Sequence, residues 1–320
     1  MTQLIARALA DPPTPSAKFC DPRRTAEGKP RARVALNGLR TLWFNTGTLC
    51  NLACGNCYIE STPRNDRLVY LSAAEVAAFL AEAEGLALGV EEVGFTGGEP
   101  FMNPDLLDML DSSLDGGYTA LVLTNAMRPM MKCVDGLKRL RRRYAERLVL
   151  RVSLDHFRQE LHEEERGPRT WGPAMAGLQW LHRNGFNVRV AGRLRWGDDE
   201  HAMRLGFQRL VQACGIDLDA WDRQRLVLFP EMDAEADTPE ITTDCWGLLG
   251  VHPHDMMCAS SRMVVKHKGA LRPSVVSCTL LPFEDGFDLG PTLAGALGDV
   301  ALNHPHCSRF CVLGGGKCSG

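Results

Sequence analysis

The sequence lacks any apolar stretch long enough to cross a lipid bilayer, which takes about 20 consecutive apolar residues. It also lacks an excess of either charge. The 36 Lys and Arg against 39 Asp and Glu give a formal net charge of −3, which argues against nucleic acid or a membrane surface as a partner. The opening stretch, MTQLIARALADPPTP, lacks the continuous apolar region of an export signal, so we expect a cytoplasmic protein.

Cysteine, by contrast, is abundant, with twelve residues in a chain of 320. In a reducing compartment, clustered cysteines indicate metal or redox chemistry more often than disulfides. Three fall within residues 50–57 and five within 258–318, whereas Cys245 stands apart. We interpret the isolated Cys20, Cys133 and Cys214 as ordinary buried thiols.

Residues 39–230 alternate between strand and helix patterns. The expected strands are 39–45, 90–95, 119–124, 147–155, 186–194 and 225–229. The expected helices are 73–86, with a capping box at Ser72 and Glu75, then 104–114, 134–146, 170–184 and 199–213. This alternation predicts right-handed βαβ units with parallel strands. Six such units predict an α/β fold, a partial (β/α)6 TIM-like barrel, whose chemistry lies at the C-terminal ends of the strands.

The composition changes along the chain and suggests three parts. Residues 1–36 are rich in proline and charge and are expected to form an extended N-terminal arm. Residues 37–240 make the partial barrel. Residues 241–320 are rich in Cys, Gly, Pro and His with little helical periodicity, so we expect a small Cys-rich C-terminal domain there.

The first cysteine group is Cys50, Cys54 and Cys57, a C-x3-C-x2-C spacing directly after the first expected strand. Three thiolates this close can bind three corners of a cubane iron–sulfur cluster, and full ligation takes four. No fourth cysteine is near in sequence, so one iron would stay open for an exogenous ligand. The alternative is a zinc site, which usually pairs C-x2-C with a second pair or with histidines.

With this motif, residues 39–230 resemble the radical S-adenosylmethionine (radical SAM) superfamily. The resemblance implies a [4Fe–4S] cluster whose open iron is chelated by the amino and carboxylate groups of S-adenosylmethionine. It further implies reductive cleavage of that cofactor to a 5′-deoxyadenosyl radical, which abstracts hydrogen from a substrate, and flavodoxin or ferredoxin as the low-potential electron donor. One departure is visible, because the family usually has an aromatic residue before the third cysteine. Here that residue is Asn56, and Tyr58 follows Cys57.

The resemblance also assigns cofactor-binding residues at successive strand ends. Glu99 in Gly97-Gly98-Glu99-Pro100 matches the family's "GGE" element for the methionine amino group, with Thr96 beside it. Ser153 and Asp155 match its S-x-D element, which suits the ribose hydroxyls or the methionine carboxylate.

Two further candidates carry open alternatives. Asn125 lies in a Thr-Asn-Ala stretch where the family has "TNG", with Ala126 in place of the glycine, or it is simply a polar strand end. Arg193 would pair with the methionine carboxylate, or it is a surface arginine. His162 and Arg166-Gly167 resemble an "HD…RG" element in which Glu163 replaces the Asp.

The second cysteine group lies in the C-terminal tail and comprises Cys258, Cys278, Cys307, Cys311 and Cys318. The segment between the first two predicts a hairpin that turns at Lys268-Gly269 and brings them together. The group resembles the auxiliary-cluster domain called twitch, a shortened SPASM domain, so we expect one auxiliary [4Fe–4S] cluster on four of the five. A zinc site that includes His304 or His306 is the alternative.

Three functions are compatible with these motifs. We expect a radical SAM enzyme acting on a small molecule, a natural-product or cofactor precursor, because residues 1–36 are too short for the recognition domain often found in peptide-modifying members. The first alternative is a peptide-modifying enzyme. The second is a non-catalytic iron–sulfur electron carrier, which would not need the Gly97-Gly98-Glu99 and Ser153/Asp155 elements.

Overall fold

A computed structural model describes residues 17–231 and 237–316. Its strands are β1 (Arg33–Val34), β2 (Thr41–Asn45), β3 (Glu92–Thr96), β4 (Thr119–Thr124), β5 (Leu148–Ser153), β6 (Asn187–Leu194), β7 (Leu226–Pro230), β8 (Ser261–Val265), β9 (Ser274–Val276) and β10 (Val300–Ala301). One sheet runs in the order β7-β6-β5-β4-β3-β2-β8-β9, and β1 pairs with β10 in a separate ribbon. Strands β2 to β8 pair in parallel, which confirms the α/β, barrel-like fold class.

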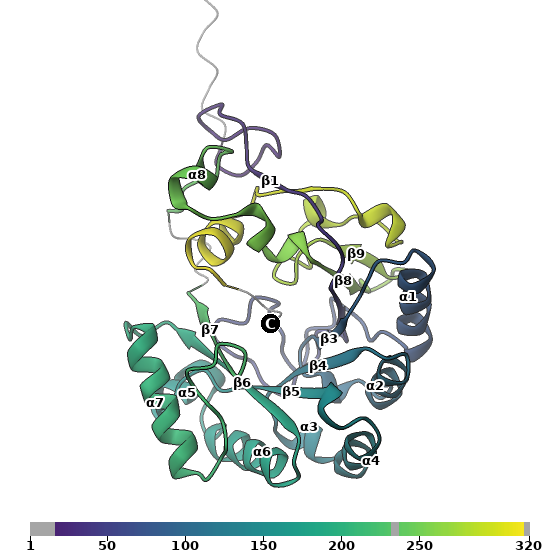
Figure 1. Ribbon diagram of the computed structural model, residues 1–320, viewed down its shortest axis with the longest axis vertical. Helices are drawn as coiled ribbons and strands as arrows, with labels where there is room; N and C mark the ends of the chain where they lie inside the picture. The colour runs from purple at the N-terminus through teal and green to yellow at the C-terminus, as the bar shows by residue number, and fades with distance from the viewer. Residues whose placement is uncertain (1–16, 232–236, 317–320) are drawn as a thin grey trace, which may run out of the picture.

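Helices cover the outer face of this curved sheet (Figure 1). They are α1 (Ala73–Gly85), α2 (Leu106–Asp115), α3 (Arg128–Met131), α4 (Val134–Tyr144), α5 (Gln159–Arg166), α6 (Trp171–Arg183) and α7 (Glu200–Ala213). Helix α8 (Cys245–Leu249) lies apart from these, near β1. The capping box at Ser72 and Glu75 is confirmed, with each side chain accepting from the other residue's backbone N–H. The short helices α3, α5 and α8 are additions to the sequence-based expectation.

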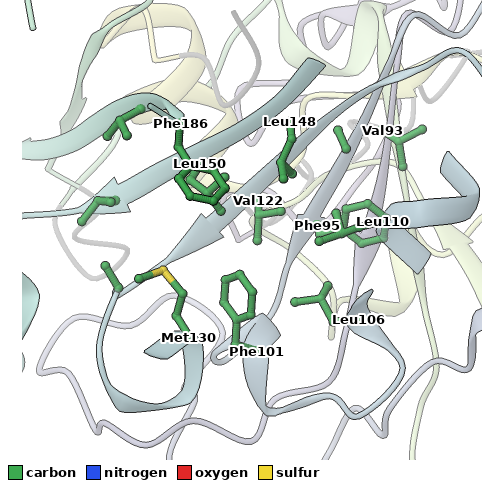
Figure 2. Packing of buried hydrophobic residues seen from close by; sticks show 14 of the residues in the cluster. Val93, Phe95, Phe101, Leu106, Leu110, Val122, Met130, Leu148, Leu150 and Phe186 are labelled. Carbon is green, nitrogen blue, oxygen red and sulfur yellow. The ribbon is translucent and has the colours of Figure 1, made fainter. Parts of the chain in front are cut away.

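The core lies between the sheet and these helices. Figure 2 shows Val93 and Phe95 from β3 beside Leu106 and Leu110 from α2, all of them buried. Their alternation on the strand and their spacing of four on the helix place both sets on the faces that meet. This packing fixes the strand ends, and therefore the loops that follow them.

The tail joins the sheet of the barrel. The expected hairpin is confirmed, since β8 and β9 pair antiparallel and Gly269 in the connecting loop has a φ of 82°. In addition, β8 pairs in parallel with β2, the strand that leads to the first cysteines. The π-helix Cys307–Leu313 contacts β7 at the other end of the sheet. Barrel and tail thus share one sheet, and the boundary at residue 240 stays a prediction.

The described part of the expected N-terminal arm, residues 17–36, is attached to the tail. Arg31 and Glu240 form a buried ion pair at 2.5 Å, and β1 pairs with β10. The expectation that Cys20 is a buried thiol is wrong, because this short, polar segment leaves it exposed, while Cys133 and Cys214 are half-buried. Within the described residues, no helix combines the length and apolar character needed to span a bilayer.

Candidate active site

A cavity at the C-terminal ends of the strands gathers most of the residues expected to form the site. We call it the first cysteine cavity. Its lining is Cys50, Cys54, Cys57, Tyr58, Ile59, Ser61, Thr96, Gly97, Gly98, Leu123, Thr124, Asn125, Ser153, Asp155, Arg166, Ala191, Arg193 and Phe229. All three cysteines and seven of the eight expected cofactor residues belong to this set, and the missing one is Glu99.

The three thiols lie on the loop that follows β2. Burial raises the pKa of Cys50 to about 12 and also raises the pKa of Cys54. Backbone N–H groups nevertheless point at two of the sulfurs, from Leu52 to Cys50 Sγ at 3.4 Å and from Ser61 to Cys57 Sγ at 3.3 Å. Cys50 is buried and Cys57 is half-buried. Thiols with such donors suit a bound metal cluster, whose positive charge replaces their protons.

The donor set fits an iron–sulfur cluster better than a zinc ion. The residues that line the cavity include three cysteines and no histidine, whereas a structural zinc site takes four ligands from cysteine and histidine. A cubane cluster can be held by three cysteines, each on a separate iron. The buried Ser61 hydroxyl also belongs to a cavity-lining residue and has no hydrogen-bond partner in the described part of the chain, so it is a donor that a bound group would satisfy.

Gly97 and Gly98 position the cysteine loop through close backbone contact. Gly97 has a φ of 144°, and a Cβ atom on Gly98 would lie 2.2 Å from the Leu49 carbonyl oxygen. The N–H groups of Gly98 and Glu99 donate to the carbonyl oxygens of Gly47 and Leu49, at 2.8 and 3.1 Å. The glycines are therefore needed for the packing of two loops, one of which runs directly into Cys50.

Glu99 lies behind the cavity wall. Its buried carboxylate accepts hydrogen bonds from Thr124 Oγ1 at 2.8 Å, the Asn125 N–H at 2.9 Å and the Phe101 N–H at 3.3 Å. Burial raises the pKa of Glu99 to about 7, despite these donors. In this structure the carboxylate fixes the Thr124-Asn125 strand end, and Asn125 Nδ2 in turn donates to Asn51 Oδ1 of the cysteine loop at 3.0 Å.

Asp155 is held by two arginines. Arg166 Nε lies 2.6 Å from Asp155 Oδ2, and Arg193 Nε lies 3.3 Å from Oδ1. Burial acts to raise the pKa of Asp155, but these guanidinium groups outweigh it and hold that pKa below its usual range. Arg193 is thus a cavity residue and not a surface arginine. Its guanidinium and that of Arg166 bring two positive charges to the cavity, and the Asp155 carboxylate balances one of them.

Ala126 stands in place of the glycine in the family's "TNG" element, and it adopts a backbone conformation that favours glycine. Its φ is 57°, in the left-handed region that favours glycine. The helix α6 packs against this turn so closely that a Cβ atom on Gly177 would lie 1.8 Å from the Ala126 carbonyl oxygen. The backbone geometry of the turn is therefore kept without the glycine.

A second cavity gathers the tail cysteines, and we call it the second cysteine cavity. Its lining is Met256, Met257, Cys258, Cys278, Leu280, Phe287, Val300, Leu302, His306, Cys307 and Cys311. Burial raises the pKa of Cys258 to about 11 and that of Cys307 to about 12, and the Leu280 N–H points at Cys278 Sγ at 3.4 Å. Cys318 lies outside the described residues.

Of the two histidines considered as zinc ligands, His306 and His304, only the first is among the residues described as lining this cavity. His306 lines it, with an Nδ1 atom that has no hydrogen-bond partner among the described residues, but His304 does not. His304 Nδ1 instead accepts from the His306 N–H at 3.0 Å. The cavity therefore offers four thiols from three segments, two of the thiols on the π-helix Cys307–Leu313, a set that fits four corners of a cubane cluster.

Several residues near the first cavity are absent from the sequence-based expectation. Phe229, at the end of β7, lines it and packs on Phe310 of the π-helix with ring centroids 5.7 Å apart. The sequence marks Arg166 only as part of a motif and gives no sign of Glu165 beside it. Phe229 could have been predicted as a cavity residue from its position at a strand end. Glu165 could not, because it lies on α5, a helix that the sequence pattern does not predict.

Comparison with known proteins agrees with this geometry. The family model "Radical SAM superfamily" matches residues 44–198. The antilisterial bacteriocin subtilosin biosynthesis protein AlbA of Bacillus subtilis (strain 168) is 26% identical over 259 residues, covering 75% of this chain and 54% of AlbA. GTP 3′,8-cyclase 1 of Mycobacterium tuberculosis is 29% identical over 197 residues, covering 58% and 51%. The chain thus spans about half the length of these curated relatives.

Solved structures share the fold. SuiB of Streptococcus suis bound to S-adenosylmethionine superposes with a TM-score of 0.58 at 15% identity, covering 80% of this chain and 64% of SuiB. The protein anSMEcpe with bound AdoMet superposes with a TM-score of 0.56 at 14% identity, covering 80% and 79%. The matched residues 44–198 contain the cysteine triplet and most of its cavity at the strand ends. This part of the chain is a radical SAM domain, and members of that superfamily are enzymes that use a [4Fe–4S] cluster and S-adenosylmethionine.

Proposed function

We propose that this chain cleaves S-adenosylmethionine reductively at a cluster held by Cys50, Cys54 and Cys57, and that the product radical abstracts hydrogen from a substrate. One observation carries the proposal. The three thiols share a single cavity with polar groups from the ends of β3, β4, β5 and β6. The cluster and cofactor, when bound, supply the electron transfer and the radical. The polar strand ends supply binding and orientation, which an electron carrier would not need.

We assign the charged and the uncharged residues of the cavity to different parts of the cofactor. The Arg166 and Arg193 guanidinium groups are suited to the methionine carboxylate, and Thr96, Gly97 and Gly98 offer backbone and hydroxyl groups near the cysteine loop. Asp155 holds both arginines in place, and Ser153 offers a hydroxyl to the ribose. Glu99 acts from behind the wall by fixing Asn125.

For the second cysteine cavity we assign an auxiliary [4Fe–4S] cluster to the four thiols that line it, Cys258, Cys278, Cys307 and Cys311. Four thiols leave no iron open, so this cluster would exchange electrons and would not bind substrate. Phe229 lines the first cavity and packs on Phe310, which is next to Cys311 in sequence, so this aromatic pair links the two cavities.

For the substrate we favour a peptide. AlbA, a bacteriocin biosynthesis protein, matches 75% of this chain, and SuiB, which shares the fold, has a structure bound to its precursor peptide SuiA. The small molecule expected from the sequence is the second candidate. It is favoured by the matches to GTP 3′,8-cyclase 1 and to AdoMet-dependent heme synthase, which cover 58% and 53% of the chain.

Anaerobic reconstitution followed by a 5′-deoxyadenosine assay tests the proposal. We expect about eight irons per chain, about four for each cluster, and deoxyadenosine once dithionite or reduced flavodoxin is added. Reconstituted protein that binds iron but forms no deoxyadenosine, with or without substrate, would contradict it. Co-expression with short peptides encoded beside the gene, followed by mass spectrometry, tests the peptide class, because a peptide that is crosslinked by the enzyme loses two hydrogens for each new bond and changes mass.

A further inference from the structure

The loop between Cys54 and Cys57 is held from outside the cavity by the end of α5. We propose that Glu165 is a positioning residue that fixes this loop, and with it the cluster, through Asn56. The inference rests on the proposed function of the three cysteines. It adds a residue that neither the motif nor the strand ends point to.

Three hydrogen bonds join Glu165 to the loop. The Gly55 N–H donates to the Glu165 backbone carbonyl at 2.8 Å. The Asn56 N–H donates to Glu165 Oε1 and Asn56 Nδ2 donates to Oε2, both at 2.9 Å. Gly55 and Asn56 are the only two residues between Cys54 and Cys57, so one side chain and its own carbonyl hold the whole intervening segment.

Two arginines from the end of β6 complete the arrangement. The Glu165 side chain is fully buried, and Arg195 Nη1 lies 2.5 Å from its Oε2. Arg193 Nη1 lies 3.5 Å from Oε1 and also donates to the Asn56 carbonyl oxygen at 3.0 Å. A buried carboxylate needs such partners, and charge-assisted bonds to it are stronger than neutral ones.

This arrangement gives a physical reason for Asn56. An aromatic side chain such as phenylalanine at this position could not donate to Glu165 Oε2, whereas the amide does so while its backbone N–H reaches the other oxygen. Groups that orient metal ligands from behind typically change metal affinity or activity by about 10–100-fold when they are lost. We therefore expect Glu165 to control how firmly the first cluster is held.

A reciprocal exchange tests the inference. Glu165→Gln places an amide against the Asn56 amide, and Asn56→Asp places two carboxylates together. The double variant restores one donor facing one acceptor. Glu164→Gln is the matched control, because Glu164 is exposed and accepts from Trp196 Nε1, a bond that glutamine can keep. Two measurements apply. The first is the rate of iron release to a chelator, counted only for the iron whose release S-adenosylmethionine slows, which we assign to the first cluster. The second is the change in the EPR spectrum of the reduced cluster on adding S-adenosylmethionine.

We expect each single variant to release this iron about tenfold faster than wild type, and Glu164→Gln to stay close to wild type. The double variant should recover part of the loss, since it restores the pairing between positions 165 and 56 while Arg195 then faces an uncharged amide. Wild-type rates in both single variants would overturn the inference, as would a defect in Glu165→Gln that Asn56→Asp does not share. If Glu165→Gln does not fold, Asn56→Asp decides alone. A wild-type protein whose EPR spectrum ignores S-adenosylmethionine would instead overturn the proposed function.

Discussion

The two cysteine cavities differ in what surrounds their thiols. The first combines three thiols with hydroxyl, amide, carboxylate and guanidinium groups from four strand ends. The second combines four thiols with methionine, leucine, valine and phenylalanine side chains, and among the described residues that line it His306 is the one ionisable group besides the cysteines. We infer from this difference that the first cavity holds a polar ligand beside a metal group, and that the second encloses a metal group alone.

The number of thiols and the polarity of the walls point the same way. An iron without a cysteine needs a ligand from outside, and that ligand must be recognised by polar groups. A fully ligated cluster needs no such groups, and an apolar shell excludes solvent from it. The difference therefore favours ligand binding in the barrel and electron exchange in the tail.

The largest expected effect is at the first cavity. Replacing Cys50, Cys54 and Cys57 together with alanine should abolish formation of 5′-deoxyadenosine and remove about four irons per chain, while about four remain in the tail. Iron and sulfide analysis with a deoxyadenosine assay measures both. Deoxyadenosine formation by this variant would show that the two cavities have been assigned the wrong way round.

The second cavity is tested by choosing between two tail cysteines. Cys311→Ser removes a thiol that lines the cavity and should cost the auxiliary cluster, about four irons. Cys318→Ser is the control and should leave the iron content unchanged. Equal losses in both variants, or a loss only in Cys318→Ser, would mean that the four cavity thiols are not the ligand set.

The sequence allowed the first cavity to be predicted better than the second. Apolar strand patterns are local, so Thr96, Asn125 and Ser153 could be placed at strand ends, and parallel strands bring those ends together. The hairpin likewise placed Cys258 near Cys278. The position of Cys311 beside them depends on how the π-helix packs on β7, which no local pattern encodes.

Helix α5 shows most clearly what could not be predicted from the sequence. Its sequence, QELHEEER, has no apolar stripe, so the periodicity that reveals other helices is missing. It buries His162 and Glu165 instead. The buried Glu165 carboxylate is stabilised by an ion pair with Arg195 and a hydrogen bond from Asn56, and both residues lie in distant segments of the chain. Burial of a polar face through tertiary partners cannot be inferred from one segment alone.

A smaller effect is expected from the ion pairs around Asp155 in the first cavity. Asp155→Asn should leave the Arg166 and Arg193 guanidinium groups without this buried counter-charge and lower the free energy of unfolding by about 4 kcal/mol. Asp198→Asn is the control, since this partly exposed residue pairs with Arg158 and His156 and should cost about 1 kcal/mol or less. Urea unfolding under anaerobic conditions measures both, and equal losses would contradict the role of Asp155.

The smallest expected effect is a dependence of stability on pH, which should have opposite signs for the two cavities. Because burial raises the pKa of Glu99 from 4.5 to about 7, the native state keeps a proton that the unfolded state has already released between those values. Stability is therefore lost as the pH rises through this window, by up to roughly 3 kcal/mol, and Glu99→Gln should remove that loss.

In the second cavity the sign is opposite. Burial lowers the pKa of His306 from 6.5 to about 4, so the unfolded state takes up a proton first, and stability is lost as the pH falls through that window. His306→Gln should remove part of the loss on the acid side and leave the loss above pH 4.5 that Glu99 causes. Thermal unfolding of wild type and both variants from about pH 4 to pH 8 measures the two slopes, which burial of each group predicts. A Glu99→Gln profile parallel to that of wild type would mean that Glu99 titrates alike in the native and unfolded states, and the carboxyl group behind the first cavity would then give no pH signature that distinguishes it from the second cavity.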